Sequence, residues 1–335
     1  MSGVIARTRV PASNALRDIQ EPVREGLDRV VEEMQRIVTD DLPLIREVSG
    51  HLLQIRGKMF RPTLALLASQ IEGRPQSRVT RLAAVVELMH LATLVHDDSV
   101  DHSVLRRGLP TVNSLFSHQI SVIMGDFLYS RALTALVSLG DLEILKIVTD
   151  VANELTIGEM RQLGAVDALA FSEEDYTHLI RAKTASLIAG ACESGALCGS
   201  SQFRGPMAEY GDRLGMAFQI ADDILDYTEN ESTTGKPGGL DLREHKVTLP
   251  LIAALPRVSA AARRRIDELF ATESPGDEII ADVIGIVAEA GGIDYARRKG
   301  EAFAHDAERA LRVLPESSVR SALTDAIAYV MDRRS

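Results

Sequence analysis

Two short segments concentrate carboxylates at a spacing that could bind divalent metal ions. The first has the sequence HDDSVDH and the second ADDILDY, each after an apolar run. An i, i+4 spacing places the first and last aspartate of each motif on one helix face, where like charges cost roughly 0.2–0.5 kcal/mol per pair. Two clusters that both bear this cost favour a compensating cation over a solvated face. The six residues are Asp97, Asp98, Asp101, Asp222, Asp223 and Asp226.

The type of ligand narrows the choice of metal. Carboxylate oxygens without clustered thiolates favour Mg²⁺, with Mn²⁺ as an alternative, over zinc. Because Mg²⁺ commonly binds one or two carboxylates together with substrate phosphates, two facing clusters predict a phosphate-bearing ligand bridged by metal ions. The two cysteines, Cys192 and Cys198, lie on an apolar stretch, and we expect both to be reduced core residues.

Basic residues flank both clusters and could contact such phosphates. Taken singly, a lysine or arginine is more often a surface charge. The pair Arg106-Arg107 begins five residues after Asp101 and precedes a Pro-Thr turn. Guanidinium groups match phosphate oxygens bidentately, so this pair favours a binding role. The other candidates are Lys58, Arg61, Lys183, Lys236 and Lys246.

Helices must position these residues, because apolar side chains recur at i, i+3, i+4 spacing along nearly the whole chain. Strand-like alternation is missing, so we expect an all-α, single-domain helical bundle. The domain is predicted over residues 18–335, after an N-terminal tail of residues 1–17. Helices are expected over residues 81–96, 114–137, 141–163, 175–198, 207–227, 260–270, 277–290, 295–313 and 318–331.

The composition excludes several classes of protein. With 45% hydrophobic and 25% charged residues, the 335-residue chain is unlike a disordered protein. A net charge of −11 and the absence of Trp argue against nucleic acid as a partner. The first 20 residues lack the apolar core of a signal peptide, and no run of about 18 consecutive apolar residues is present. We therefore expect a cytoplasmic protein without a transmembrane segment.

The order of motifs resembles the trans-isoprenyl diphosphate synthases, or polyprenyl synthetases. After DDSVD come LRRGLPT at 105–111, GDFL at 125–128, KTA at 183–185, and FQ at 218–219 before DDILD. The likeness extends from about Arg56 to Pro250 and is greatest to long-chain members such as octaprenyl diphosphate synthases. It implies an isoprenoid synthase bundle with a central cavity, usually a homodimer. It also implies a Mg²⁺-dependent prenyltransferase that joins an allylic diphosphate to isopentenyl diphosphate.

The resemblance also implies roles at matching positions. Asp97, Asp101 and Asp222 would hold the metal ions, and the other three aspartates would support them. The groups implied at the allylic diphosphate are Arg106, Lys183, Lys236 and Lys246. Those implied at the isopentenyl diphosphate are Lys58, Arg61, His90 and Arg107. The oxygen atoms implied near the carbocation belong to the backbone of Lys183 and to the side chains of Thr184 and Gln219.

The chemistry explains these residue types. Breaking the allylic C–O bond places negative charge on diphosphate and positive charge on carbon, so cations must stabilise the departing group. The double bond of isopentenyl diphosphate then attacks the cation, and a proton is lost. Water would quench the cation, so an apolar, closed cavity is expected. In RGKMFRP the family often has a second glycine and another basic residue, but Lys58 and Arg61 are retained.

Three residues upstream of the first motif are candidates for controlling product length. The prenyl tail is expected to run back along the helix past Thr93 and Ala92 and then Met89. Ala92 lies about 7 Å from Asp97 along the axis, so an aromatic residue there would stop the tail early. In the family, an Ala-Thr pair resembles long-chain enzymes. We expect an all-trans product longer than geranylgeranyl diphosphate, and product release leaves transient membrane contact open.

Three other functions stay open at this point. A terpene cyclase also uses aspartate motifs but usually lines its site with aromatic rings. A metal-dependent phosphohydrolase could use a His96-Asp97 dyad, although His90, His96 and His102 point about 120° apart on a helix. For His90, a core histidine is the alternative to a ligand-binding one. A catalytically idle scaffold subunit is the third alternative, against which the two intact motifs argue.

Overall fold

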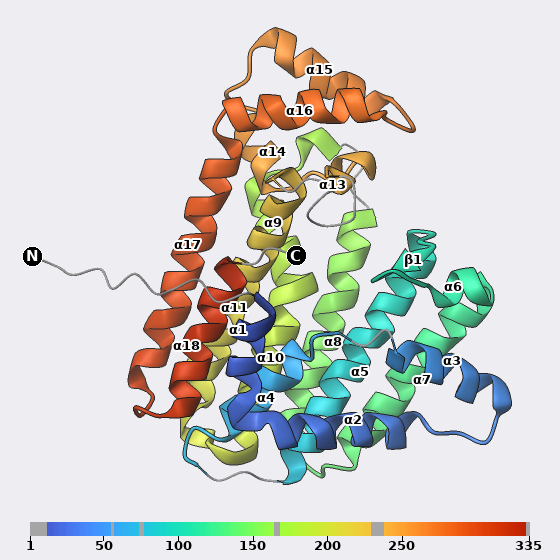
Figure 1. Cartoon of the computed structure of the whole chain (residues 1–335), viewed down its shortest axis with the longest axis vertical. Coiled ribbons are helices and arrows are strands. Elements are labelled where there is room, and N and C mark those ends of the chain that lie inside the picture. The colour runs from blue at the N-terminus through green and yellow to red at the C-terminus, as the bar shows by residue number, and fades with distance from the viewer. Residues whose placement is uncertain (1–11, 55–56, 74–76, 164–167, 229–237, 333–335) are drawn as a thin grey trace, which may run out of the picture.

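The computed structural model describes residues 12–54, 57–73, 77–163, 168–228 and 238–332. Helices dominate this part of the chain (Figure 1). The N-terminal half holds α1 (Ala12–Gln20), α2 (Arg24–Val38), α3 (Pro43–Gln54), α4 (Phe60–Ser69), α5 (Ser77–Val100), α6 (Val112–Leu115), α7 (His118–Val137) and α8 (Leu142–Leu163). The C-terminal half holds α9 (Glu173–Ile180), α10 (Ser186–Gly199), α11 (Arg204–Thr228), α13 (Leu240–Arg243), α14 (Leu249–Ala254), α15 (Ala260–Ala271), α16 (Asp277–Glu289), α17 (Gly292–Ala310) and α18 (Ser318–Met331).

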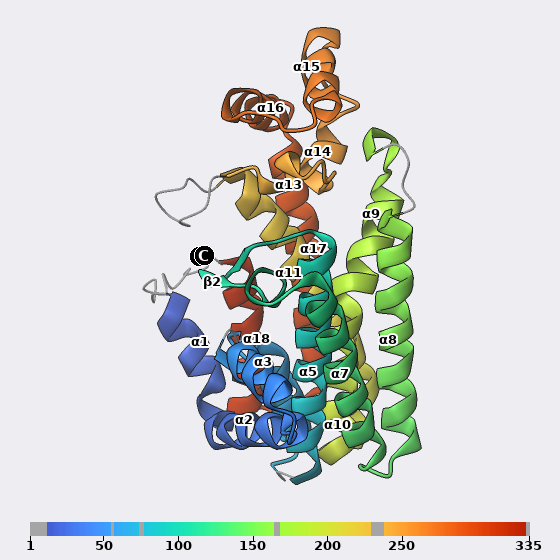
Figure 2. The same ribbon diagram turned by 90° about the vertical axis from the view of Figure 1, so that its right-hand side faces the viewer.

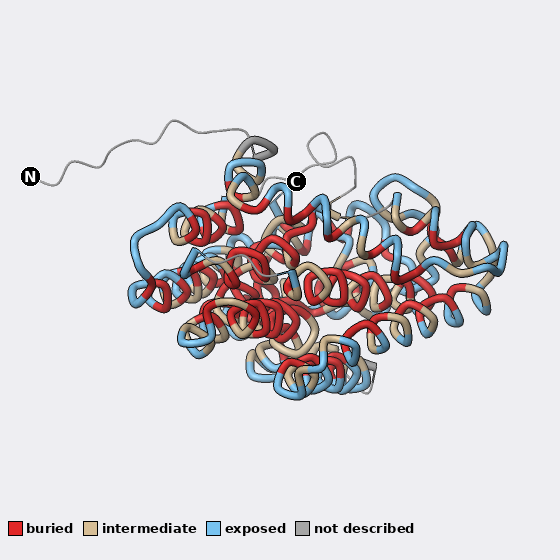
Figure 3. Tube along the Cα trace, turned by 90° about the horizontal axis from the view of Figure 1, so that it is seen from below, coloured by how far each residue is buried: buried red, intermediate tan, exposed pale blue. Residues whose placement is uncertain are grey.

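Two long helices, α5 and α11, carry the aspartate motifs and run through the interior. Helix α5 packs against α7 and α4, while α11 packs against α10 and α17. The middle of α5 is buried on all sides, including Leu82, Val85 and Met89, as the apolar run in the sequence requires. Figure 3 shows buried residues gathered on the inner helices and exposed ones on the outer turns. The all-α prediction is confirmed for the described residues.

A smaller hydrophobic cluster lies at one end of the bundle. It is built from α14, α16 and the adjoining parts of α11 and α17, with Val283 and Val287 fully buried. Helices α15 and α16 extend from this end, away from the N-terminal helices (Figure 1). The main cluster includes both cysteines, Cys192 and Cys198, which are buried and unpaired as expected.

Two predicted helices are interrupted in the structure. The helix expected over 114–137 breaks because the Ser117 hydroxyl caps a new helix, accepting from the backbone N–H of Ile120 at 3.2 Å. The helix expected over 175–198 contains a π-helical turn, Arg181–Ala185, between α9 and α10. Such turns often lie at functional sites. Here the turn includes Lys183 and Thr184.

A short β-hairpin, with two residues in each strand, joins α5 to α6, although no strand was expected there. Strands β1 (Leu105–Arg106) and β2 (Leu109–Pro110) pair antiparallel. The two residues between them, Arg107 and Gly108, have φ angles of 53° and 77°. Positive φ at both central positions is the geometry of a tight hairpin turn, which the glycine favours. The turn holds Arg106 and Arg107 close to the end of α5.

Among the described residues, two helices, α5 and α7, are long and apolar enough to cross a membrane by length and composition alone. In α5, 67% of the apolar segment is buried within the bundle, which is typical of a core helix. In α7 the buried share is 39%. Helix α1 begins at Ala12, and Ile19 is buried. The expected boundary between residues 17 and 18 stays a prediction.

Candidate active site

The first aspartate motif lies at the C-terminal end of α5. Asp97 and Asp98 occupy its last turn, and Asp101 follows the helix, with its N–H donating to the Asp97 carbonyl at 2.8 Å. Across from this end, Lys246 Nζ lies 3.7 Å from the Asp101 carboxylate. Lys246 follows α13, the helix that comes after the second aspartate motif. The structure therefore brings the surroundings of the two motifs together.

Asp97 lies among other acidic groups. Burial, together with the nearby carboxylates of Glu159 and Asp101, raises the pKa of Asp97 to about 6. The cations Lys183 and Arg106 act in the opposite direction. A partly buried group of carboxylates is the environment that a divalent cation stabilises.

Asp98 is turned towards the hairpin instead. Arg106 Nη2 lies 2.7 Å from one Asp98 oxygen, and its Nε lies 2.8 Å from the other. The Asp98 carboxylate is buried, with 6% of its surface exposed. Its lone pairs are therefore used mainly to hold the Arg106 guanidinium in place.

In the second motif, on the last turns of α11, neighbouring aspartates likewise differ in burial and in their partners. Asp222 is exposed, whereas Asp223 is buried. Asp223 accepts a hydrogen bond from the Tyr176 hydroxyl at 2.5 Å and another from Gln219 Nε2 at 2.8 Å. Asp226 accepts from the backbone N–H groups of Leu240 and Asp241, at 2.9 and 3.0 Å. Asp226 thus anchors the start of α13.

The three residues predicted near the carbocation come together at the π-helical turn. Thr184 Oγ1 donates to Gln219 Oε1 at 2.7 Å. Because Gln219 also donates to Asp223, its amide is oriented by two partners. The Lys183 ammonium contacts Glu159 at 2.6 Å and Gln162 at 2.8 Å, both on α8. The π-helical turn thus places adjacent residues against two different helices, α8 and α11.

A second basic group lies beside α5, one turn or more before the aspartates. A small cavity there is lined by residues of the 57–61 loop region, of α5 and of the hairpin, among them Gly57, Glu87, His90 and Arg107. At Gly57 a Cβ atom would lie 2.7 Å from the Arg107 guanidinium, so glycine lets the loop approach the hairpin closely. Burial, and then the charges of Arg61 and Arg107, lower the pKa of His90 well below its usual value. His90 is therefore neutral at physiological pH.

One predicted residue, Lys236, lies outside the described residues. Of the other predicted metal- and diphosphate-binding residues, most lie around the aspartates, while Arg61, half-buried, lies with Arg107 near His90. Lys58 is exposed in the loop before α4, and its contacts are with Tyr329 and Gln20.

A model of the polyprenyl synthetase family matches residues 42–287 of this chain. The chain belongs to this family. The all-trans-nonaprenyl-diphosphate synthase (geranyl-diphosphate specific) of Rhodobacter capsulatus is 38% identical over 319 residues, 95% of this chain and 98% of that protein. Octaprenyl diphosphate synthase of Haemophilus influenzae is 36% identical, covering 95% and 97% of the two chains.

Solved structures agree with the family assignment. The polyprenyl synthase of Caulobacter crescentus CB15, complexed with calcium and isoprenyl diphosphate, superposes with a TM-score of 0.90 at 31% identity. The superposition covers 96% of this chain and 98% of that one. The polyprenyl synthetase described here is thus a prenyltransferase with the predicted isoprenoid synthase fold.

The oxygen-rich donor set of this polyprenyl synthetase suits a hard divalent ion. Asp97 and Asp101 lie at the end of one helix and Asp222 in the other motif, so their carboxylates could supply oxygen ligands, while Asp98, Asp223 and Asp226 accept hydrogen bonds from the protein. Among the described residues, no three His, Cys, Asp or Glu side chains converge closely enough to hold an ion by themselves. An ion held by these carboxylates would need further oxygen ligands.

Four residues of the site were not predicted from the sequence. Burial and the charge of Asp226 raise the pKa of Asp241 to about 7, which places Asp241 in the second acidic group. Glu159 and Gln162 hold Lys183, and Glu87 lies buried near Arg61 and Arg107. None belongs to a recognised motif. Their only sequence signal is a polar residue on a mostly apolar helix or beside a Gly-Gly loop.

His96, considered above for a His-Asp dyad, is engaged by α7. Its Nε2 lies 3.3 Å from the Asp126 carboxylate and 3.2 Å from the Val122 carbonyl oxygen. Gly125 makes room for this ring, because a Cβ atom there would lie 2.2 Å from His96 Nε2. The Gly-Asp pair of the GDFL motif thus fastens α7 to the end of α5.

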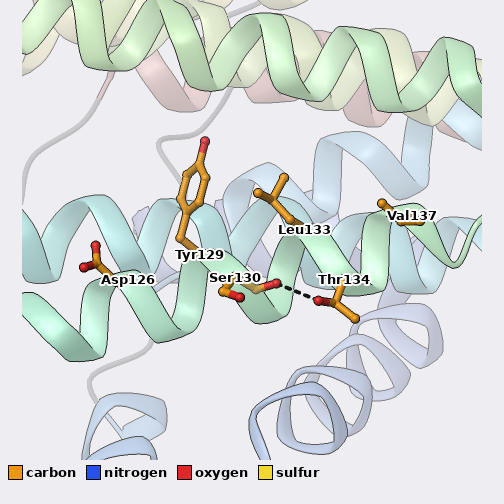
Figure 4. A pocket seen from close by; sticks show the side chains of 6 residues that line it. All are labelled: Asp126, Tyr129, Ser130, Leu133, Thr134 and Val137. Carbon is orange, nitrogen blue, oxygen red and sulfur yellow. Dashed lines mark hydrogen bonds between the residues drawn. The ribbon is translucent and has the colours of Figure 1, made fainter.

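The predicted length-controlling residues lie on the buried side of α5. Ala92 and Met89 have no exposed surface, and Thr93 donates to the His90 carbonyl at 2.8 Å. A separate surface groove of about 480 Å³ runs along α7 from Asp126 to Val137 (Figure 4). Tyr129 and Leu133 point to one side of this helix, and Ser130 and Thr134 lie lower in the view.

Proposed function

We propose that this polyprenyl synthetase condenses an allylic diphosphate with isopentenyl diphosphate to give an all-trans product longer than geranylgeranyl diphosphate. The observation that supports the proposal is the presence of two separate groups of basic side chains. One combines carboxylates with Lys183 and Lys246, as a metal-bound diphosphate needs. The other, around His90, Arg61 and Arg107, is basic and suits a diphosphate without metal.

In this proposal Mg²⁺ ions, with Mn²⁺ as a substitute, bind to Asp97, Asp101 and Asp222. The bound ions supply positive charge to the departing diphosphate. Calcium in the related Caulobacter structure supports divalent metal binding, and the choice of Mg²⁺ rests on the oxygen donor set. Lys236, outside the described residues, is assigned to the same diphosphate by its place after the second motif.

The protein's own groups then have separate tasks. Asp98 holds Arg106 towards the allylic diphosphate, and Glu159 with Gln162 holds Lys183. Gln219 Oε1 accepts from Thr184 and retains a second lone pair, which can face the carbocation. Because Gln219 Nε2 is bound to Asp223, the amide cannot rotate freely to present its positive end.

Isopentenyl diphosphate is assigned to Lys58, Arg61, His90 and Arg107. His90 is neutral, so it contributes a hydrogen bond rather than charge. The tail of the growing product is assigned to the face of α5 that carries Thr93, Ala92 and Met89. Since Ala92 and Met89 have no exposed surface, neighbouring side chains must move apart as the chain lengthens.

We also propose a homodimer and a cytoplasmic location. Helix α7 exposes Ile123 and Val137, with 66% and 60% of their surfaces accessible, and α8 exposes Met160 at 66%. Exposed apolar side chains on two helices that follow one another in the chain suit burial against a second copy. Sedimentation of the purified protein would distinguish dimer from monomer.

The decisive experiment incubates the purified protein with labelled isopentenyl diphosphate, Mg²⁺ and one short allylic diphosphate at a time. We expect a ladder of all-trans products ending beyond geranylgeranyl diphosphate, and no product when EDTA removes the metal. A product no longer than geranylgeranyl diphosphate would refute the length assignment. A cyclic hydrocarbon formed without isopentenyl diphosphate would identify a cyclase. No turnover, with no Mg²⁺-dependent stabilisation by a bisphosphonate, would indicate an idle subunit.

A further inference from the structure

Lys58 lies close to an aromatic residue of the C-terminal helix. Its Nζ is 5.9 Å from the centroid of the Tyr329 ring on α18. This distance is within the range at which an aromatic face attracts an ammonium group. Tyr329 is itself buried, with 6% of its surface exposed, so the ring is a fixed partner for a flexible side chain.

The Tyr329 ring is the first of a row of three. Its centroid lies 5.8 Å from that of Phe60, which directly begins α4 after the Lys58 loop. Phe60 lies 6.0 Å from Phe218, and their planes are 24° apart. Phe218 precedes Gln219 on α11. The row therefore connects α18 to the loop that holds Lys58 and to the helix that holds Gln219.

The N-terminal helix fixes the same loop from the other side. Gln20, the last residue of α1, donates through Nε2 to the Lys58 carbonyl at 2.9 Å and to Thr63 Oγ1 at 3.1 Å. Met59, which directly follows Lys58, has a φ of 53°, a left-handed conformation that a non-glycine residue rarely adopts. Such a conformation persists only where its surroundings hold it. The Thr63 hydroxyl, which donates to the Met59 carbonyl at 2.7 Å, is part of this support.

Helices α1 and α18 also pack against each other (Figure 2). Both lie outside residues 42–287, the part of the chain that the family model matches. The first and last of the described helices thus pack together behind the Lys58 loop.

We propose that Tyr329 and Gln20 are positioning residues that hold Lys58 for isopentenyl diphosphate. Tyr329 restrains the ammonium group, and Gln20 restrains the backbone. Without them, Lys58 must be ordered when the substrate binds, and affinity falls by the cost of that ordering. The inference rests on the proposed role of Lys58 as a ligand of that diphosphate.

The test measures initial rates of the full-length enzyme with Mg²⁺, varying each substrate in turn. We expect Tyr329→Leu to raise the KM for isopentenyl diphosphate about fivefold. The KM for the allylic diphosphate and kcat should stay within about twofold. Tyr329→Phe retains the ring and should behave like the natural enzyme. Tyr295→Leu is the matched control, because the Tyr295 ring lies 5.5 Å from both the Arg257 and Lys299 cations, away from Lys58.

Gln20→Ala provides an independent variant at a partly exposed position, in case Tyr329→Leu does not fold. It should raise the same KM about threefold. An unchanged KM for isopentenyl diphosphate in both variants, or an equal rise in both substrate KM values, would overturn the inference.

Lys58→Ala tests the proposed role of Lys58 separately from the positioning roles of Tyr329 and Gln20. If it leaves the KM for isopentenyl diphosphate unchanged, the proposed role of Lys58 fails. If it raises that KM while Tyr329→Leu and Gln20→Ala do not, only the positioning role fails. The double variant Lys58→Ala/Tyr329→Leu should bind no more weakly than Lys58→Ala, since the ring then has no ammonium to hold.

Discussion

Asp98 and Arg106 form a bidentate pair: the arginine Nη2 and Nε lie 2.7 and 2.8 Å from the two carboxylate oxygens. The pair joins the end of α5 to the first strand of the hairpin. It gives neighbouring aspartates of one motif different tasks, because Asp97 stays among acidic groups while Asp98 is paired with a cation.

This pairing predicts that Asp98 serves substrate binding, through Arg106, while Asp97 serves metal binding. Asp98→Asn weakens a charge-assisted hydrogen-bond pair and should raise the KM for the allylic diphosphate about tenfold. Asp97→Asn should instead raise the Mg²⁺ concentration needed for half-maximal rate. Initial rates over a Mg²⁺ series and a substrate series check both. An equal shift in Mg²⁺ requirement for the two variants would contradict this division of roles.

The hydroxyl of Tyr176 donates to buried Asp223 at 2.5 Å, and this bond should contribute to stability. Burial raises the pKa of Asp223 well above its usual value, so the carboxyl depends on its two hydrogen-bond donors. Tyr176→Phe should lower the free energy of unfolding by about 1–3 kcal/mol. Tyr295→Phe, which removes a more exposed 2.7 Å bond to Glu173, should cost less. Urea denaturation of the two variants gives the comparison, and equal losses would argue against the buried bond.

Ala92→Phe should shorten the product if the tail follows α5. Ala92 is fully buried, about 7 Å along the helix from Asp97, so a phenyl ring would fill the path. Overpacking should also cost about 1–3 kcal/mol of stability. Ala254→Phe, at an equally buried alanine on α14, controls for that cost and should leave product length unchanged. Chain-length analysis decides, and an unaltered product from Ala92→Phe would place the tail elsewhere.

Glu33 predicts a pH-dependent contribution to stability. Hydrogen bonds from Arg36, at 2.5 Å, and Arg81, at 2.8 Å, lower its pKa to about 2 from 4.5. A carboxyl with a lowered pKa stabilises the fold fully above about pH 4.5 and loses that contribution as the pH falls towards 2. Glu33→Gln should thus cost about 1 kcal/mol at pH 7, because the pair is partly exposed to solvent.

The same variant should differ less from the natural protein at pH 3. Urea denaturation at the two pH values measures the change. A cost that is constant or greater at pH 3 would show that the carboxylate charge is not the source of the stabilisation.

Much of the fold could be predicted because its signals are local. Helices α8, α11 and α15–α18 lie within a few residues of the predicted ranges, since i, i+3, i+4 periodicity is read within a single helix. The breaks at Ser117 and at the π-helical turn were not predicted. Periodicity continues across both, the first break depends on a side-chain cap, and the π-helical turn packs against α8 and α11.

By itself, the sequence determined the helical class, the family and the residue types available for metal and phosphate. The reason is that motif order and helical spacing are properties of the chain alone. Tertiary structure decided which protein groups donate hydrogen bonds to Asp223 and Asp226. Tyr176, which donates to Asp223, lies 47 residues from it in the sequence. Leu240, whose backbone N–H donates to Asp226, lies 14 residues after that aspartate. Tyr329 and Gln20 reach Lys58 only because folding brings the first and last of the described helices behind one loop.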